Sequence, residues 1–272
     1  MSAPFTSVPP DALKQKKYVV AFLDFLGASE KMRSPEESDK FLQKIYTIYH
    51  RVIDAMDEAP DHGKPKLDIR IFSDNILFAK KFEAQKPLFE EWQYVSRWAS
   101  VFQALALRHE LPIRGAITFG DFYIDETFVY GDALVRAHEM EARRAIYPRI
   151  IVDEAFFRDT IFTGVVGFMK NITFSLDSDG EFFLDFISPL VLGNNPKGTR
   201  ENYVSIRTAI IKLFHRHKGR PELKQKYCWL VYKFNELIKN RVVDDRHKIV
   251  LDANNEPDLS VIYEDETRGQ HE

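Results

Sequence analysis

Tyr18-Val-Val-Ala-Phe-Leu-Asp-Phe-Leu-Gly27 is the stretch of sequence that decides the fold. Its first six residues form an uninterrupted apolar run rich in strand formers, which Asp24 closes and Gly27 follows. Such a run is typical of a strand buried on both faces, and the glycine is typical of a turn. The sequence therefore predicts a buried central strand with Asp24 at its exit.

Further helices and strands are predicted on the C-terminal side of this strand. Apolar residues at helical spacing indicate helices over residues 35–56, 87–110 and 131–146. Apolar runs bounded by turn residues indicate strands over residues 67–71, 76–78, 112–120 and 149–152. The order strand, helix, hairpin, helix, strand, helix, strand is the ferredoxin-like arrangement. We therefore expect an α+β fold with an antiparallel sheet and helices on one face.

The rest of the chain extends this core. Residues 168–187 indicate another hairpin that turns at Asp177-Ser-Asp-Gly180, and residues 199–241 indicate two helices separated near Gly219. We expect one elaborated domain with three parts. These parts are an N-terminal arm over residues 1–17, a core domain over residues 18–190, and a C-terminal helical extension over residues 191–272 packed on the core.

Composition excludes several classes of protein. Lys and Arg total 38 against 41 Asp and Glu in 272 residues, a net charge of −3, so no basic surface for nucleic acid is indicated. The apolar runs are far shorter than the roughly 20 residues of a membrane span. Cys228 is the only cysteine, so no internal disulfide can form. We expect a protein of the reducing cytoplasm with no nucleic-acid or membrane partner.

Two aspartates lie at strand ends where the formation of the strands does not require a carboxylate. Asp24 ends the buried strand, and Asp74 is placed at the tip of the hairpin over residues 67–78. In a ferredoxin-like sheet these strands are neighbours, and paired carboxylates are costly to keep ionised unless a cation shares them. Hard oxygen ligands suit Mg²⁺ or Mn²⁺. The alternative is that Asp24 caps a helix and Asp74 only serves the turn.

Four segments resemble one enzyme family. Phe22-Leu-Asp-Phe-Leu-Gly27 and Arg70-Ile-Phe-Ser-Asp74 resemble the two metal-binding segments of class III nucleotidyl cyclases. Pro112-Ile-Arg-Gly-Ala-Ile-Thr-Phe-Gly120 is similar to their strand with an arginine and a glycine, and Tyr130-Gly-Asp-Ala-Leu-Val-Arg-Ala-His-Glu-Met-Glu141 is similar to their glycine-led catalytic helix. All four occur in the family's order. The resemblance extends over roughly residues 18–154 and implies that residues 18–190 form a class III cyclase catalytic domain.

The resemblance implies a reaction and its cofactors. The 3′ oxygen of a nucleoside triphosphate attacks its own α-phosphate and releases pyrophosphate. Two divalent cations, Mn²⁺ or Mg²⁺, are expected on Asp24, Phe25 and Asp74. A homodimer with composite active sites is also implied, in which Asp24 and Asp74 of one subunit face the helix of the other.

The turn after the first strand is expected to bind the triphosphate. Backbone N–H groups of Phe25, Leu26, Gly27, Ala28 and Ser29 can cradle phosphate oxygens, and Gly27 permits a close approach. A simple tight turn explains the glycine equally well.

Two positions at which the sequence differs from the cyclase family indicate which nucleobase the substrate carries. The family's adenine-reading positions hold Arg70 and Phe128. Arginine donates to carbonyl oxygens, and phenylalanine offers only an apolar or stacking face. Uracil, with two carbonyls, suits such a reader. The sequence therefore resembles the uridylate and cytidylate cyclases of bacterial Pycsar antiphage systems, with UTP as the expected substrate and CTP as the alternative. Their cyclic nucleotide product is read by a separate effector.

The transition-state arginine of the family is displaced. Val135 and Glu139 occupy the positions where the family has an asparagine and an arginine, so Arg143 or Arg136 is expected to supply the positive charge. The alternative is that Glu139, Glu141, Arg143 and Arg144 form a solvated, ion-paired helix face. The chain is then a degenerate cyclase that senses nucleotide without turnover. A palm-like nucleotidyl transferase is disfavoured because Ser73-Asp-Asn75 contains no Gly-Gly-Asp/Glu turn.

Overall fold

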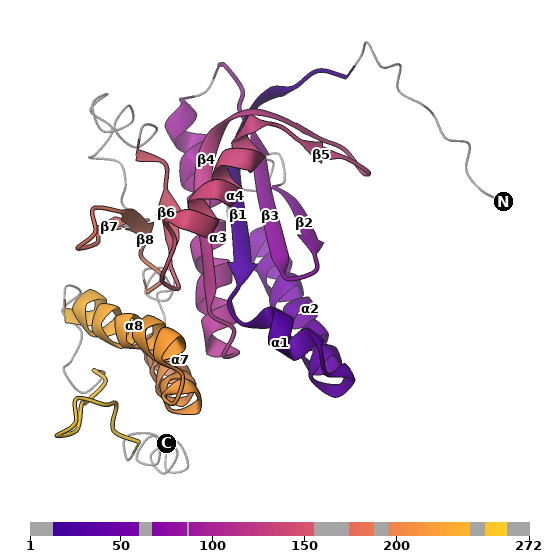
Figure 1. Ribbon diagram of the computed structural model, residues 1–272. Coiled ribbons are helices and arrows are strands. Elements are labelled where there is room, and N and C mark those ends of the chain that lie inside the picture. The colour runs from indigo at the N-terminus through magenta and orange to yellow at the C-terminus, as the bar shows by residue number, and fades with distance from the viewer. Residues whose placement is uncertain are drawn as a thin grey trace.

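The computed structural model describes residues 13–59, 67–85, 87–154, 174–187, 196–239 and 248–259. Within them the chain forms an α+β fold, with an open mixed sheet of eight strands and six helices (Figure 1). The expected α+β class is confirmed. Residues 1–12 of the predicted arm, residues 60–66, 86, 155–173 and 188–190 of the predicted core domain, and residues 191–195, 240–247 and 260–272 of the predicted extension lie outside the described residues.

The secondary structure follows the predicted order through the core. The strands are β1 (Lys16–Phe25), β2 (Asp68–Phe72), β3 (Asn75–Lys81), β4 (Ile113–Ile124), β5 (Val129–Tyr130), β6 (Ile150–Val152), β7 (Phe174–Leu176) and β8 (Phe182–Leu184). The helices are α1 (Ala28–Met32), α2 (Pro35–Glu58), α3 (Leu88–Arg108), α4 (Asp132–Arg143), α7 (Pro196–His217) and α8 (Pro221–Lys239). The short α1 and β5 were not among the predicted elements.

Strand β1 lies at the centre of the sheet, whose order is β2-β3-β1-β4-β6-β8-β7 with β5 paired to β4. It pairs antiparallel with both β3 and β4. Strands β4 and β6, however, run parallel. The prediction of an entirely antiparallel sheet is therefore wrong. The cause is α4, because a crossover helix between two neighbouring strands returns the chain in the same direction.

Helices cover both faces of the sheet. Val19 and Leu23 pack in a cluster with residues of α2 and α3, whereas Val20 packs with Ala133 of α4. Successive side chains of a strand point to opposite faces, so α4 lies across the sheet from α2 and α3 (Figure 1). The prediction of helices on one face is wrong for α4. The position of α4 also explains why the sequence of β1 is apolar without alternation, because helices bury both faces of this strand.

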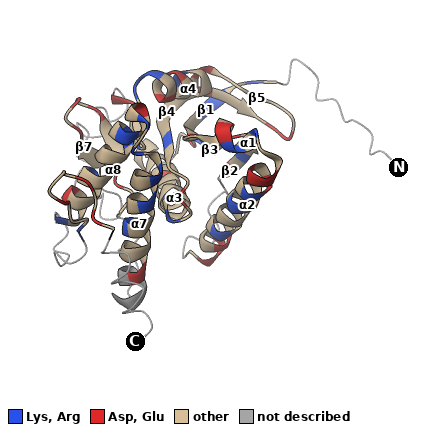
Figure 2. Ribbon diagram, turned by 60° about the horizontal axis from the view of Figure 1, so that its bottom comes forward, with Lys and Arg blue, Asp and Glu red and all other residues tan. Residues whose placement is uncertain are grey.

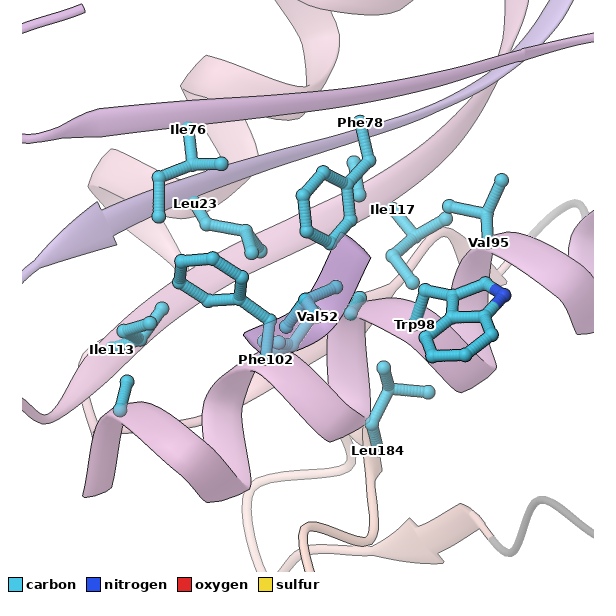
Figure 3. Packing of buried hydrophobic residues seen from close by; sticks show 14 of the residues in the cluster. Leu23, Val52, Ile76, Phe78, Val95, Trp98, Phe102, Ile113, Ile117 and Leu184 are labelled. Atoms are coloured by element: carbon cyan, nitrogen blue, oxygen red, sulfur yellow. The ribbon is translucent and has the colours of Figure 1, made fainter. Parts of the chain in front are cut away.

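The larger core lies between the sheet and α3. Figure 3 shows Phe102 of α3 close to Leu23 of β1 and Phe78 of β3, and the two phenylalanine ring centroids are 5.6 Å apart. Burying each of these side chains stabilises the fold by about 1.5–3 kcal/mol. This packing stabilises β1, which contains Asp24, and β3, which Asp74 immediately precedes.

The C-terminal helices pack on the other end of the sheet. Phe214 of α7 and Phe234 of α8 share a buried cluster with Ile151 and Phe183 of the sheet. The predicted helix pair with a break near Gly219 is confirmed, since α7 ends at His217 and α8 begins at Pro221. Among the described helices, none combines the length and hydropathy needed to cross a membrane.

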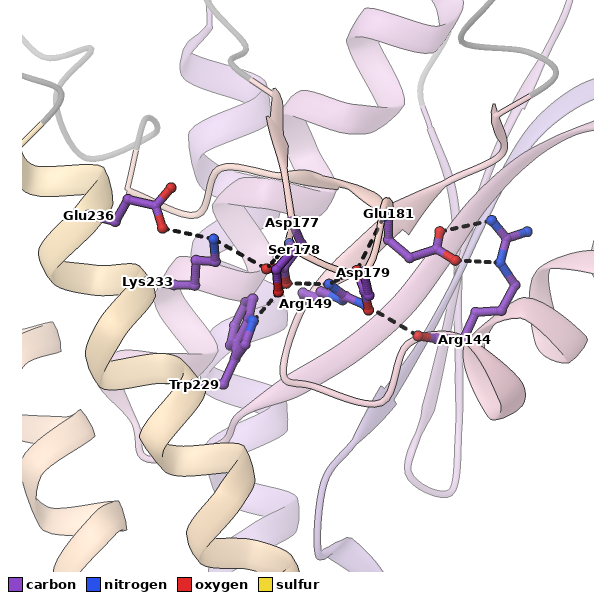
Figure 4. Close-up of polar contacts among 9 residues, drawn as sticks. All are labelled: Arg144, Arg149, Asp177, Ser178, Asp179, Glu181, Trp229, Lys233 and Glu236. Carbon is purple, nitrogen blue, oxygen red and sulfur yellow. Dashed lines mark hydrogen bonds and ion pairs between the residues drawn. The ribbon is translucent and has the colours of Figure 1, made fainter.

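A buried ion network joins the β7–β8 turn to α8 (Figure 4). Arg149 is completely buried and forms ion pairs with Asp177 and Asp179 in the turn. Trp229 of α8 donates its indole N–H to Asp177 at 2.7 Å, and Lys233 lies 3.2 Å from the same carboxylate. The predicted turn at residues 177–180 is confirmed, and these contacts fix it against the C-terminal helices.

Candidate functional site

The structure brings Asp24 and Asp74 to the same end of neighbouring strands. Asp24 is the last partner of β3 in the ladder, opposite Asn75. The next residue, Phe25, donates its N–H to the backbone carbonyl of Asp74 at 3.1 Å. The strand adjacency expected from the sequence is confirmed, and the hydrogen bond fixes the hairpin tip against the end of β1.

Arg114 and Glu141 complete a charged cluster around Asp24. Arg114 lies opposite Asp24 in the β1–β4 ladder and donates from Nε to Asp24 Oδ2 at 3.1 Å. The same nitrogen is 2.6 Å from Oε1 of Glu141, which α4 projects toward the sheet. The Glu141 side chain is only 5% exposed. Neither residue was among the predicted site residues.

Burial raises the pKa of both carboxyl groups. The pKa of Asp24 is raised above its ordinary value chiefly by burial, an effect that Arg114 opposes and the nearby charge of Asp74 reinforces. Burial likewise raises the pKa of Glu141, again opposed by Arg114 and reinforced by Asp24. Both carboxyl groups are therefore harder to ionise than in water, although they share Arg114.

Helix α8 adds a cation that the sequence did not indicate. Lys226 interacts electrostatically with Asp24 and Glu141, and burial is the main cause of its lowered pKa, followed by repulsion from Arg114. The C-terminal extension therefore contributes directly to the electrostatics of the Asp24 site. From the sequence, the extension was expected to pack on the core or to extend a dimer contact, and no residue of it was predicted in the site.

The turn after β1 has fewer free N–H groups than expected. Phe25 and Leu26 donate theirs to the carbonyls of Asp74 and Pro112, at 3.1 and 2.9 Å. Within the predicted phosphate cradle, only the N–H groups of Gly27, Ala28 and Ser29, at the start of α1, therefore remain available to bind phosphate oxygens. Gly27 has φ 77°, a backbone conformation that strongly favours glycine.

Arg70 and Phe128 meet at the turn between β4 and β5. Arg70 donates from Nη2 to the carbonyl of Asp125 at 3.0 Å. Phe128 closes this turn, since its carbonyl accepts from the N–H of Asp125 at 3.0 Å, and the residue is 64% exposed. The two predicted base-contacting residues are therefore near one another in a single chain, with the phenyl ring open to solvent.

The candidate arginines of α4 face away from Asp24. Arg136 forms ion pairs with Asp153 and Asp132 and donates to the carbonyl of Phe119 at 3.3 Å. Arg143 is exposed and has no ion-pair partner among the described residues. Both line a cavity of about 340 Å³ on the outer side of α4. Within one subunit, neither completes the site at Asp24.

The alternative of an ion-paired face on α4 is wrong. Glu141 is buried against Arg114, on a different side of the helix from Arg143. Arg144, just past the helix, pairs with Glu181 on the far end of the sheet through two hydrogen bonds of 2.7 and 2.8 Å. The charged side chains at the end of α4 therefore reach separate partners.

The aspartates fit a divalent cation that keeps water or substrate oxygens as further ligands. Arg114 occupies Asp24 Oδ2 and Asn75 donates to Asp74 Oδ1 at 3.2 Å, so each carboxylate retains an oxygen for metal. Mg²⁺ is commonly held by one or two carboxylates together with substrate phosphates. The described part of the chain contains no cluster of three or more His, Cys, Asp or Glu side chains able to hold a metal ion.

Neither a protein-family model nor a curated protein matches this chain. The functional conclusion therefore depends on the chemistry of the site and on the four sequence motifs.

Proposed function

We propose that the chain is a metal-dependent pyrimidine nucleotide cyclase that converts UTP to 3′,5′-cyclic UMP and pyrophosphate. The observation that carries this proposal is the juxtaposition of Asp24 and Asp74, fixed by the hydrogen bond from Phe25 to Asp74. Two hard-oxygen side chains at one strand end, beside a glycine turn, are the arrangement that metal-assisted phosphoryl transfer requires.

In this proposal the residues around β1 position the triphosphate. Asp24, Asp74 and the carbonyl of Phe25 would hold two Mg²⁺ or Mn²⁺ ions, and the N–H groups of Gly27 to Ser29 would bind phosphate oxygens. When bound, the cations lower the pKa of the attacking 3′-hydroxyl and neutralise charge on the triphosphate. A bond forms from the 3′ oxygen to the α-phosphorus, the bond to the β-phosphate oxygen breaks, and the hydroxyl proton is lost to solvent.

Arg70 selects the base in this proposal. Its guanidinium already donates to a backbone carbonyl in the β4–β5 turn, which is the chemistry that a uracil carbonyl would share. The exposed ring of Phe128 offers a stacking face beside it. Cytosine also presents a carbonyl, so cyclisation of CTP to cyclic CMP is the alternative activity.

A homodimer supplies the transition-state charge. Because Arg143 is exposed on the outer side of α4, it is available to the site of a second subunit. A mixture of two inactive variants, Asp74→Ala and Arg143→Ala, tests this arrangement. Random mixing makes half of the dimers mixed, each with one intact composite site, so about a quarter of wild-type activity returns. Without any recovery, the composite site is excluded.

One observation favours a second candidate, a nucleotide sensor without turnover. Arg136 is engaged by Asp153 and Asp132, and Asp24 is engaged by Arg114, so the charges needed for catalysis have partners inside the subunit. A sensor of this kind binds the triphosphate and releases it unchanged.

The deciding experiment is incubation of the purified protein with each of the four ribonucleoside triphosphates and Mg²⁺ or Mn²⁺, with products identified by mass spectrometry. Cyclic UMP from UTP supports the proposal, and cyclic CMP supports the alternative substrate. A linear dinucleotide indicates a transferase. Binding of UTP by calorimetry with no product supports the sensor. A role in antiphage defence, with a separate effector reading the product, follows only from the resemblance to Pycsar cyclases.

A further inference from the structure

A second cavity lies between the α1–α2 region and the C-terminal helices. Its volume is about 500 Å³, which is within the usual range for small-molecule sites. Its described lining includes Gly27, Lys31, Phe41, Lys44 and Tyr227, but neither Asp24 nor Asp74. The cavity therefore contains neither proposed metal-binding aspartate, although at Gly27 it borders the proposed phosphate cradle. Glu30 of α1 and Arg220, between α7 and α8, tie its two sides together with a hydrogen bond of 2.8 Å.

Four Lys and Arg side chains and three glutamates, Glu30, Glu37 and Glu110, line the cavity, which leaves one cation in excess. Figure 2 shows Lys and Arg on both α2 and α7, the helices that face it. Two of its cationic side chains are already neutralised, since Arg216 pairs with Glu110 and Lys40 pairs with Glu36. The remaining ammonium groups belong to Lys31 and Lys44.

Lys31 and Lys44 are available to a ligand. Lys31 forms no hydrogen bond or ion pair with any described residue, and its ammonium lies 5.6 Å from the centroid of the Phe41 ring. Lys44 donates one hydrogen bond, to the carbonyl of His109 at 3.0 Å, which leaves two N–H donors. Burial, with repulsion from Lys44 and Arg216, lowers the pKa of Lys31 to about 8. An anion between the two ammonium groups relieves this repulsion.

Tyr227 supplies a third donor. Its side chain lines the cavity although the residue is only 4% exposed. Its hydroxyl forms no hydrogen bond with the described residues, so it can donate to a ligand in the cavity. Burial raises the pKa of Tyr227 to about 12, so the hydroxyl remains protonated and able to donate at neutral pH.

We propose that this cavity binds a small organic phosphate, with Lys31, Lys44 and the Tyr227 hydroxyl as donors to its phosphate group. Two ammonium groups match the dianionic charge of a phosphate monoester, and a carboxylate would neutralise only one of them. Leu111, Leu213 and Leu223 provide an apolar wall for the organic part of the ligand. This site does not depend on the proposed cyclase activity.

Calorimetric titration of the full chain tests the proposal, with ribose 5-phosphate, glycerol 3-phosphate and inorganic phosphate as probes and ribose as the uncharged control. Lys31→Met should weaken binding by about ten- to a hundred-fold, and Tyr227→Phe by up to about ten-fold. Lys17→Met is the matched control, since Lys17 is exposed, pairs with Asp121 and does not line the cavity. Ribose should not bind.

Two results would overturn the proposal. One is that none of the three phosphate probes binds the wild-type protein more tightly than about 10 mM. The other is equal binding by wild type, Lys31→Met and Lys44→Met, which would place the phosphate elsewhere. Circular dichroism shows whether each variant is folded, and the wild-type titration decides independently of them. Because the readout is heat and not turnover, loss of this site and loss of the cyclase activity are distinguishable.

Discussion

Arg114 Nε donates to Asp24 Oδ2 at 3.1 Å and at the same time lies 2.6 Å from Glu141 Oε1. One guanidinium therefore bridges the end of β1 and the inner side of α4. Two largely buried carboxylates share it, and both have raised pKa values because burial penalises their charge. This bridge links the proposed metal ligand to the helix that resembles the catalytic helix of cyclases.

Loss of the bridge should destabilise the fold. Arg114→Met leaves Asp24 and Glu141 close together without their shared cation, and breaking a buried ion pair costs about 3–5 kcal/mol. Because Arg114 is 24% exposed, we expect a value near the lower end. Urea denaturation measures the change. Arg143→Met, an exposed control, should change the free energy of unfolding by less than about 0.5 kcal/mol. Equal stability of the two variants would contradict the structural role of the bridge.

Asp74→Ala should abolish cyclic nucleotide formation without unfolding the protein. The side chain is at a hairpin tip, while the backbone carbonyl that accepts from Phe25 survives the substitution. Loss of a metal-ligating carboxylate should reduce kcat by at least about a thousand-fold. Asp39→Ala, on the exposed side of α2, is the matched control. Product formation by the Asp74 variant at the wild-type rate would exclude the metal assignment.

Arg70→Ala should alter nucleotide selection more than overall turnover of the best substrate. Loss of a charged hydrogen bond to the base lowers kcat/KM for UTP by about ten- to a hundred-fold. The substitution also removes the hydrogen bond to the Asp125 carbonyl, so thermal unfolding should be measured on the same sample. Competition assays with all four triphosphates report the preference. If the ranking of substrates is unchanged in a folded variant, another residue reads the base.

Acid should weaken the network around Asp177. Burial alone would raise the pKa of this carboxyl, but hydrogen bonds from Ser178, Trp229 and Lys233 hold it below its ordinary value of 3.8. The folded protein therefore binds this proton less readily than the unfolded chain. The stabilisation is complete above about pH 4 and is lost as the pH falls through the lowered pKa.

Urea denaturation of wild type and Asp177→Asn at several pH values checks this direction. The variant should be less stable at neutral pH because Arg149 loses a buried partner. The difference between the two proteins should shrink as the pH falls toward about 3. A difference that stays constant over this range would show that Asp177 does not carry the pH dependence.

The sequence by itself determined the elements that depend on local periodicity. The apolar run before Asp24 predicted the central strand, and helical spacing predicted α2, α3 and α4, because side-chain burial repeats with the period of each structure. The proximity of Asp24 and Asp74 was also predictable from the sequence. A short hairpin fixes its own register, and the buried strand that contains Asp24 was the expected neighbour of the hairpin that contains Asp74. The bound metal ions, the nucleobase of the substrate and the cyclisation reaction remain predictions.

Only the tertiary structure decided which distant residues share the site. The pairing of β1 with β4 places Arg114 beside Asp24. The rotation of α4 about its axis turns Glu141 toward the same site, and the packing of α8 brings Lys226 near it. None of these relationships has a local sequence period, because each depends on how separate elements pack. The same reason explains the errors over the parallel β4–β6 pair and the position of α4 across the sheet. Local patterns specify which face of an element is buried, while long-range packing selects the residues that it is buried against.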